Sequence, residues 1–122
     1  MAHASSSIPF FVATYERVLT PAEAALVGEF CRLEHPGLNS DLGALRVVGR
    51  CGCGACPTVF FEPHRPEAKA REIASYAGVD AGGGVTGVAL WETEERLSQL
   101  EFWSVDGHEP WSAPSIATLE KL

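Results

Sequence analysis

The chain has 122 residues, which is long enough to bury a hydrophobic core without disulfide bonds and too short for two domains of ordinary size. Its hydrophobic fraction of 46% and charged fraction of 20% are typical of a globular protein and exclude an intrinsically disordered one. A formal net charge of −7 repels phosphate backbones and anionic lipid, so we expect neither a nucleic-acid nor a membrane partner.

The N-terminal segment lacks the features of a secretory signal. Its apolar stretch, Ile8–Ala13, has no Lys or Arg before it and is shorter than the apolar run of a signal peptide. No segment approaches the roughly 18 apolar residues that a membrane span requires. We therefore predict a cytoplasmic protein with one domain over residues 1–122, in which residues 1–7 are disordered.

The clearest local pattern predicts a helix that begins after Thr20. Thr20 can cap the helix, and Glu23, three residues later, completes a capping box. The helix should end near Glu34 or His35, because Pro36 cannot continue it. Apolar residues recur on one helical face, which we expect to be buried; they are Leu26, Val27, Phe30, Cys31 and Leu33.

Several segments are rich in the β-branched and aromatic residues that favour strands. These segments are Ile8–Val18, Leu45–Arg50, Thr58–Glu62, Val85–Trp91 and Leu97–Val105. We expect the first of them to be a strand or an extended segment and the other four to be strands. We expect the segments at 45–50 and 58–62 to pair as an antiparallel hairpin, and a charged turn at 92–96 to join the last two strands.

One further helix is predicted from Pro66 to Ala77, because its first half is rich in strong helix formers. A single helical turn at 40–44, a glycine loop at 81–84 and an irregular tail complete the chain, and the tail should pack Trp111, Ile116 and Leu119 onto the core. These elements predict an α+β fold. We expect an antiparallel sheet of about four strands in meander order, with the N-terminal helix packed on one face.

Three cysteines, Cys51, Cys53 and Cys56, lie within six residues of one another. The intervening glycines let the backbone turn sharply and direct amide hydrogens toward sulfur, as thiolate metal sites do. A structural zinc site has four ligands, so a fourth must come from elsewhere. We name His64 first, because it follows the strand that leaves the cluster; the alternatives are His35, Cys31, His108, water or a second chain.

Two other interpretations of the cysteines stay open. Cys53 and Cys56 have the C-x-x-C spacing of redox pairs, although Pro57 and strand-like residues follow where a thioredoxin-like motif has a helix. The cysteines are also typical small core residues that need no metal, since unpaired cysteine is among the most buried residue types. No nucleophile with a matching base is recognisable, so we expect a non-enzymatic protein.

The segment Val48–Val59, with the sequence VGRCGCGACPTV, resembles a group of small uncharacterised bacterial proteins that have a Cys-x-Cys-Gly-x-Cys-Pro hairpin. The helix ended by Pro-Gly, the strand Leu97–Gly107 and the proline-rich tail are also similar, so the resemblance covers about residues 19–115. Many members have a shorter Cys-x-Cys-Gly-Cys-Pro form, and Ala55 here shifts Cys56 relative to them. The resemblance implies a fold and a compartment, and it implies no activity.

Charge and size predict a small acidic module that binds a protein partner or regulates one. Its acidic charge would steer it toward a basic partner. We expect aromatic residues near the end of the chain to contact that partner; they are Phe102, Trp103 and Trp111. The alternative function is metal binding, with zinc, or thiol redox chemistry at Cys51, Cys53 and Cys56.

Overall fold

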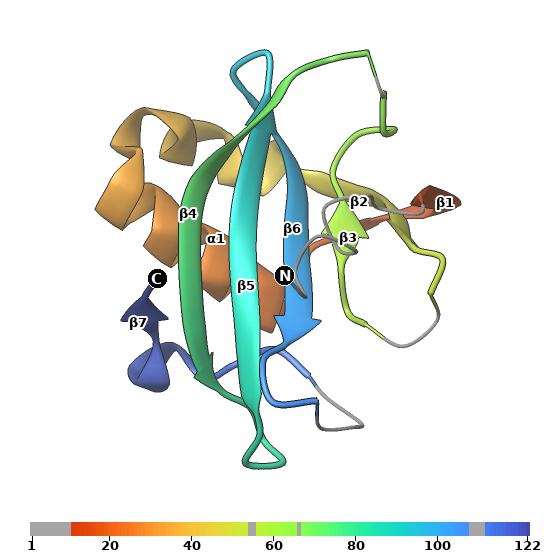
Figure 1. Ribbon diagram of the computed structural model, residues 1–122. Helices are drawn as coiled ribbons and strands as arrows, with labels where there is room; N and C mark the ends of the chain where they lie inside the picture. The colour runs from red at the N-terminus through yellow and green to blue at the C-terminus, as the bar shows by residue number, and fades with distance from the viewer. Residues whose placement is uncertain (1–10, 54–55, 66, 108–111) are drawn as a thin grey trace.

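The computed structural model describes residues 11–53, 56–65, 67–107 and 112–122 (Figure 1). Over these residues the chain forms one seven-stranded sheet, in which every strand pair is antiparallel. The strands are β1 (Phe11–Val18), β2 (Arg46–Cys51), β3 (Val59–Phe60), β4 (Ala70–Val79), β5 (Val85–Thr93), β6 (Arg96–Ser104) and β7 (Glu120–Lys121). Their order across the sheet is β1-β2-β3-β6-β5-β4-β7.

The fold is therefore mostly β, and the prediction of an α+β protein with about four strands is wrong. The predicted meander order is also wrong, because β3 pairs with β6 rather than with β4. Two strands were missed. One of them, β7, has only two residues and pairs with β4, too short a segment for a sequence pattern to indicate.

The other missed strand is β4, where we predicted a helix. Its first three residues are exposed, and from Ile73 to Gly78 half-buried positions alternate with buried ones, which are Ala74, Tyr76 and Gly78. It pairs with β5 along its length, from Ala70 opposite Thr93 to Val79 opposite Val85. Local helix propensity is worth only tenths of a kcal/mol per residue, and pairing with β5 and β7 outweighs it.

The helix α1 (Pro21–Glu34) forms where its capping residues predict it. The side-chain oxygen of Thr20 accepts the backbone N–H of Glu23 at 3.1 Å, and the Glu23 carboxylate accepts the backbone N–H of Thr20 at 2.9 Å. Four of the five expected apolar residues are buried, including Cys31, whereas Leu33 is exposed. A 3-10 helix, η2 (Pro36–Ala44), follows α1 where we predicted a single turn.

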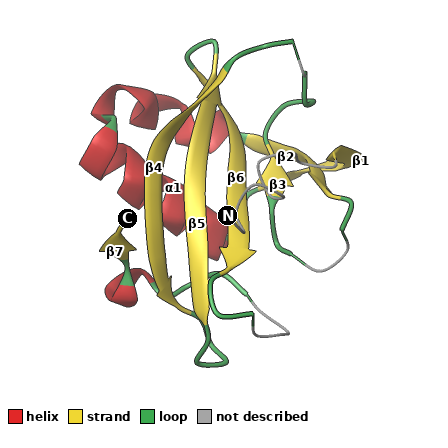
Figure 2. Ribbon diagram, in the orientation of Figure 1, coloured by secondary structure: helices red, strands yellow, loops and turns green. Residues whose placement is uncertain are grey.

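The core lies between α1 and one face of the sheet. Leu90 is opposite Leu100 and Val88 is opposite Phe102 in the β5–β6 ladder, and these residues pack with the buried side of the helix. Figure 2 shows α1 behind strands β4, β5 and β6. Because side chains alternate along a strand, Trp91, Gln99 and Glu101 belong to the opposite face. One face of the sheet thus packs against α1 to form the core, and the opposite face carries Trp91, Gln99 and Glu101.

The C-terminal segment differs in part from the prediction. Leu119 packs against the core as expected, whereas Ile116, in the short 3-10 helix η3 (Ile116–Thr118), is exposed. Trp111 and the predicted disordered residues 1–7 lie outside the described residues. Among the described helices, none is long and apolar enough to cross a membrane.

Candidate functional site

The cysteine cluster lies at the turn between β2 and β3. Cys51 is the last residue of β2, and its backbone N–H donates to the carbonyl oxygen of Thr58 at 3.2 Å. Beyond this bond the two strands pair with Arg50 opposite Val59 and Gly49 opposite Phe60. The predicted antiparallel hairpin is confirmed, and its turn carries Cys53 and Cys56.

The three sulfur atoms converge instead of pointing apart. The Sγ atoms of Cys51, Cys53 and Cys56 all lie within 4.8 Å of one another, close enough to bind one metal ion. The Sγ atoms of Cys53 and Cys56 are 3.2 Å apart, and none of the three cysteines is in a disulfide. Cys53 is exposed, and the other two are half-buried. A ligand can therefore reach the cluster from solvent.

Backbone amides of the turn point toward the sulfurs. The N–H of Cys53 donates to the Sγ of Cys51 at 3.5 Å, and the N–H of Cys56 donates to the Sγ of Cys53 at 3.3 Å. Backbone N–H groups of this kind are the hydrogen-bond donors that sulfur ligands accept in the outer shell of a metal site. The glycine-rich turn thus supplies the donors that the sequence predicted.

Thr58 connects the cluster to the middle of the sheet. Its hydroxyl oxygen accepts the backbone N–H of Phe102 at 2.9 Å and lies 3.4 Å from the Sγ of Cys56. The residue is 3% exposed, so the position of its hydroxyl is fixed by the strand β6. Cys56 is consequently held against a rigid part of the fold, while Cys53 faces solvent.

Burial raises the pKa of the Cys56 thiol to about 12. The sulfurs of Cys53 and Cys51 add to the rise, and hydrogen bonds to Thr58 oppose it. At neutral pH and without a metal ion, Cys56 is therefore a thiol. A bound cation deprotonates a coordinating thiol outright, so metal binding here would release a proton from Cys56.

The predicted fourth ligand, His64, is not part of the cluster. Among the described residues, no other Cys, His, Asp or Glu joins the three sulfurs. His64 lies on the loop after β3, with its ring 6.3 Å from the ring of Phe60. Cys31 is fully buried in the core, as predicted for a core residue, and His35 lines a different hollow next to Arg71. His108 lies outside the described residues.

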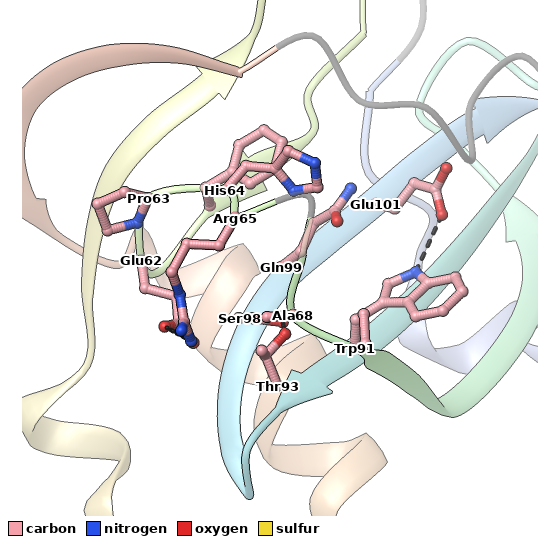
Figure 3. A pocket seen from close by; sticks show the side chains of 12 residues that line it. Glu62, Pro63, His64, Arg65, Ala68, Trp91, Thr93, Ser98, Gln99 and Glu101 are labelled. Atoms are coloured by element: carbon pink, nitrogen blue, oxygen red, sulfur yellow. Dashed lines mark hydrogen bonds and ion pairs between the residues drawn. The ribbon is translucent and has the colours of Figure 1, made fainter.

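His64 instead lines a pocket on the sheet face opposite α1 (Figure 3). The cavity has a volume of about 80 Å³, and residues after β3 form one of its walls. In Figure 3, Glu62 and Arg65 lie together at one end, while Trp91 and Glu101 lie at the other. The loop from β3 to β4 thus covers part of a sheet face that would otherwise meet solvent.

The pocket has a buried carboxyl group that sequence analysis missed. Glu101 is only 2% exposed, and its Oε1 accepts the indole N–H of Trp91 at 3.0 Å. Near them the hydroxyl of Thr93 donates to the Oγ of Ser98 at 3.0 Å, and both residues are buried. In the sequence, Glu101 stands between Leu100 and Phe102, a position that predicts an exposed side chain on the polar face of a strand. No local pattern indicates the loop that covers it.

The chain matches no family model, and no curated protein or solved structure matches it. The resemblance to the bacterial Cys-x-Cys-Gly-x-Cys-Pro group therefore stays a prediction.

Proposed function

We propose that the protein binds one zinc ion through the thiolates of Cys51, Cys53 and Cys56. The observation that carries the proposal is the convergence of the three sulfurs within 4.8 Å. A tetrahedral site with Zn–S bonds of about 2.3 Å places its sulfurs about 3.8 Å apart, so small side-chain movements complete the geometry. Soft thiolate ligands select zinc over hard cations such as magnesium and calcium.

The proposed site has one coordination position open to an external ligand. Three thiolates supply three of four tetrahedral positions, and within the described ranges no further Cys, His, Asp or Glu joins them. Because Cys53 is exposed, water or a side chain of another molecule can occupy the fourth position. We therefore propose that the metal remains accessible to exchange and to partners.

Zinc titration of the full chain tests the proposal. Metal-free, reduced protein is titrated against a chromophoric zinc chelator, and bound zinc is counted by elemental analysis. We expect one zinc per chain with a Kd in the nanomolar range, since structural zinc sites bind with about 10 kcal/mol or more. Cobalt substitution should give the sulfur-to-metal charge-transfer bands of a thiolate site.

A matched pair of variants identifies the ligands. Cys53→Ala should weaken zinc binding at least about 100-fold, because it removes a direct ligand. Loss of a residue that only hydrogen-bonds to a ligand typically lowers metal affinity 10–100-fold, and loss of the ligand itself should cost more. Cys31→Ala, which removes a sulfur buried in the core, should leave affinity unchanged. His64→Ala should also leave it unchanged, since His64 lies outside the cluster. Protein that takes up no zinc, or equal affinities for the two cysteine variants, would contradict the proposal.

A second candidate function is thiol redox chemistry, which the 3.2 Å distance between the sulfurs of Cys53 and Cys56 favours. A disulfide bond of about 2.05 Å requires the sulfurs to approach by little more than 1 Å. Against this function, β3 follows the cluster, and the described residues from 46 to 60 form no helix whose N-terminus could lower a thiol pKa. Oxidation would remove two protons and two electrons from the thiols and transfer the electrons to a disulfide such as oxidised glutathione.

Equilibration with glutathione redox buffers separates the two functions. A redox protein should form the Cys53–Cys56 disulfide reversibly in metal-free form, as read by mass spectrometry after alkylation. A cluster that serves only to bind zinc should remain reduced in buffers at the potential of the cytosol. The zinc proposal does not depend on this result.

The predicted protein-binding role stays a prediction, and its expected contact residues are revised. Phe102 is buried in the core and Trp103 is half-buried, while Trp111 lies outside the described residues. The exposed apolar side chains lie elsewhere, including Tyr15 and Val18 on the edge strand β1, which are 97% and 63% exposed. An unpaired strand edge is a common site for adding a partner strand.

A further inference from the structure

Two of the three proposed zinc ligands are also placed where they can bond to each other. The Sγ atoms of Cys53 and Cys56 lie 3.2 Å apart, and a disulfide bond between them would have a length of about 2.05 Å. Neither residue is in a disulfide in the structure. The same two sulfurs can therefore hold a metal ion or join covalently after a small movement.

The surroundings of the two sulfurs favour such a movement. Cys56 is held against the sheet, because its Sγ lies 3.4 Å from the hydroxyl oxygen of Thr58, a residue that is 3% exposed. Cys53 is exposed, and its Sγ accepts the backbone N–H of Cys56 at 3.3 Å. An oxidant in solution can thus reach Cys53 directly, and the sulfur of Cys56 lies beside it to complete the bond.

Zinc and the disulfide exclude each other because they need the same sulfurs. The thiolate is the form of cysteine that binds a metal ion, and a disulfide sulfur no longer has this form. After Cys53 and Cys56 join, Cys51 is the one member of the cluster that can still offer a thiolate. One protein ligand falls short of the four that hold a structural zinc ion and the three that hold a catalytic one.

We propose that the cluster is a redox-regulated zinc site, in which a Cys53–Cys56 disulfide forms reversibly and releases the zinc ion. The inference rests on the proposed zinc function and adds its regulation. The oxidant is a low-molecular-weight disulfide such as oxidised glutathione. Reduced glutathione reverses the reaction and restores the three-sulfur site.

The reaction proceeds by two thiol–disulfide exchanges. The Cys53 thiolate attacks one sulfur of oxidised glutathione, which forms a mixed disulfide and expels one glutathione thiolate. The Cys56 thiolate then attacks the Cys53 sulfur and expels the second glutathione thiolate. Two electrons pass from the cysteines to glutathione, and the zinc ion leaves. The two glutathione thiolates and the thiolate of Cys51 take up protons from solvent.

A redox titration of the full chain, with and without zinc, tests the proposal. The protein is equilibrated without oxygen, at constant pH, in glutathione buffers of increasing potential. A chelator holds free zinc at about 100 times the Kd of the reduced protein. Mass spectrometry after acid quenching and alkylation in denaturant counts and locates the disulfide, and elemental analysis counts protein-bound zinc.

Zinc should make the cluster harder to oxidise, because it binds the reduced protein alone. At about 100 times the Kd it should favour the reduced protein about 100-fold. For a two-electron couple a tenfold change corresponds to about 30 mV, so zinc should raise the midpoint potential by about 60 mV. Bound zinc should fall along the same curve as the disulfide forms, and reduction should restore it.

A matched pair of variants separates zinc binding from disulfide formation. Cys51→Ser removes a proposed zinc ligand and keeps both sulfurs of the disulfide. Its disulfide should still form, and the same free zinc should favour its reduced state at most about twofold, since loss of a ligand should weaken binding at least about 100-fold. Cys31→Ala, which removes a sulfur buried in the core, should keep the full effect of zinc on the midpoint.

The two zinc proposals fail in different ways. Reduced protein that takes up no zinc would contradict the zinc function and this inference with it. Protein that binds zinc when reduced, yet forms no disulfide or keeps its zinc after oxidation, would overturn the redox regulation alone. A midpoint that zinc does not move, or a disulfide that joins Cys51 in place of Cys53, would do the same.

Discussion

Cys56 and Cys53 are neighbours in the same turn, yet they differ in exposure. Burial raises the pKa of the Cys56 thiol to about 12, whereas Cys53 lies open to solvent. Only the thiolate reacts with an alkylating agent, so the rate at Cys56 follows its small thiolate fraction. In metal-free folded protein we expect the alkylation rate of Cys56 to rise about tenfold per pH unit from pH 8 to beyond pH 10.

Peptide mass spectrometry after timed exposure to iodoacetamide measures this rate. The same protein unfolded in urea is the control, and there the rate should level off near the ordinary thiol pKa of about 8.5. A plateau at that pH in the folded protein would show that the sheet does not protect Cys56. The same measurement with zinc present should show slow alkylation at all three clustered cysteines, under the proposed function.

At the residue scale, the cysteine cluster was the predictable part of the site. Three thiols within six residues, separated by glycine, must lie close together whatever the rest of the chain does. His64 was predicted as their fourth ligand from its distance along the sequence alone, and among the described residues it does not join them. The loop after β3 carries it to the opposite face of the sheet from α1, where it lines the pocket with Glu101. Such long-range placement has no local sequence pattern.

The β5–β6 hairpin is an element with a strained turn. Its strands end at Thr93 and begin again at Arg96, so the predicted charged turn contains only Glu94 and Glu95. Both residues have positive φ, 53° and 64°, as two-residue hairpin turns require and as non-glycine residues disfavour. Glu94 is held by contacts with Arg65 and Arg96, at 3.0 and 3.4 Å.

Replacing Glu95 by glycine should therefore stabilise the protein. We expect Glu95→Gly to raise the free energy of unfolding by about 0.5–1 kcal/mol, because glycine adopts positive φ without steric cost. Glu72→Gly, at an exposed position inside β4, is the matched control and should lower it by a similar amount. Urea denaturation measures both. A loss of stability in Glu95→Gly would mean that the carboxylate matters more than the turn conformation.

At the element scale, predictions succeeded where the determining interactions were local. The capping box of α1 involves Thr20 and Glu23, three residues apart, and it forms as expected. The prediction failed at β4, where strong helix formers occupy the first residues. There the deciding interactions are pairs with β5 and β7, and the partner at β7 is more than 40 residues distant in the sequence.

The whole molecule should lose stability in alkaline solution. Burial raises the pKa of Cys56 and Tyr76 to about 12, a hydrogen bond to Glu34 adds to the rise at Tyr76, and burial also raises the pKa of Cys31. Above the ordinary thiol pKa of about 8.5, the unfolded chain loses these protons while the folded protein keeps them. The unfolded state then binds fewer protons, so the free energy of unfolding falls as pH rises toward 12.

Thermal denaturation between pH 8 and pH 11 measures this decline. In Tyr76→Phe the melting temperature should fall less steeply above pH 10, because the phenolic proton no longer contributes to the pH dependence of stability. Tyr15→Phe makes the same chemical change at a side chain that is 97% exposed, and it should not change how steeply the melting temperature falls with pH. Equal slopes for the two variants would mean that the buried phenol does not govern alkaline unfolding.

The sequence by itself determined the features that depend on nearby residues: the capped helix α1, the β2–β3 hairpin and the three thiols gathered at its turn. Only the tertiary structure decided that the sheet has seven strands, that β3 lies beside β6, and that a loop encloses Glu101. The physical reason is the range of the interactions. Caps and tight turns are fixed by bonds across a few residues, whereas strand order and burial depend on packing between segments far apart in the chain.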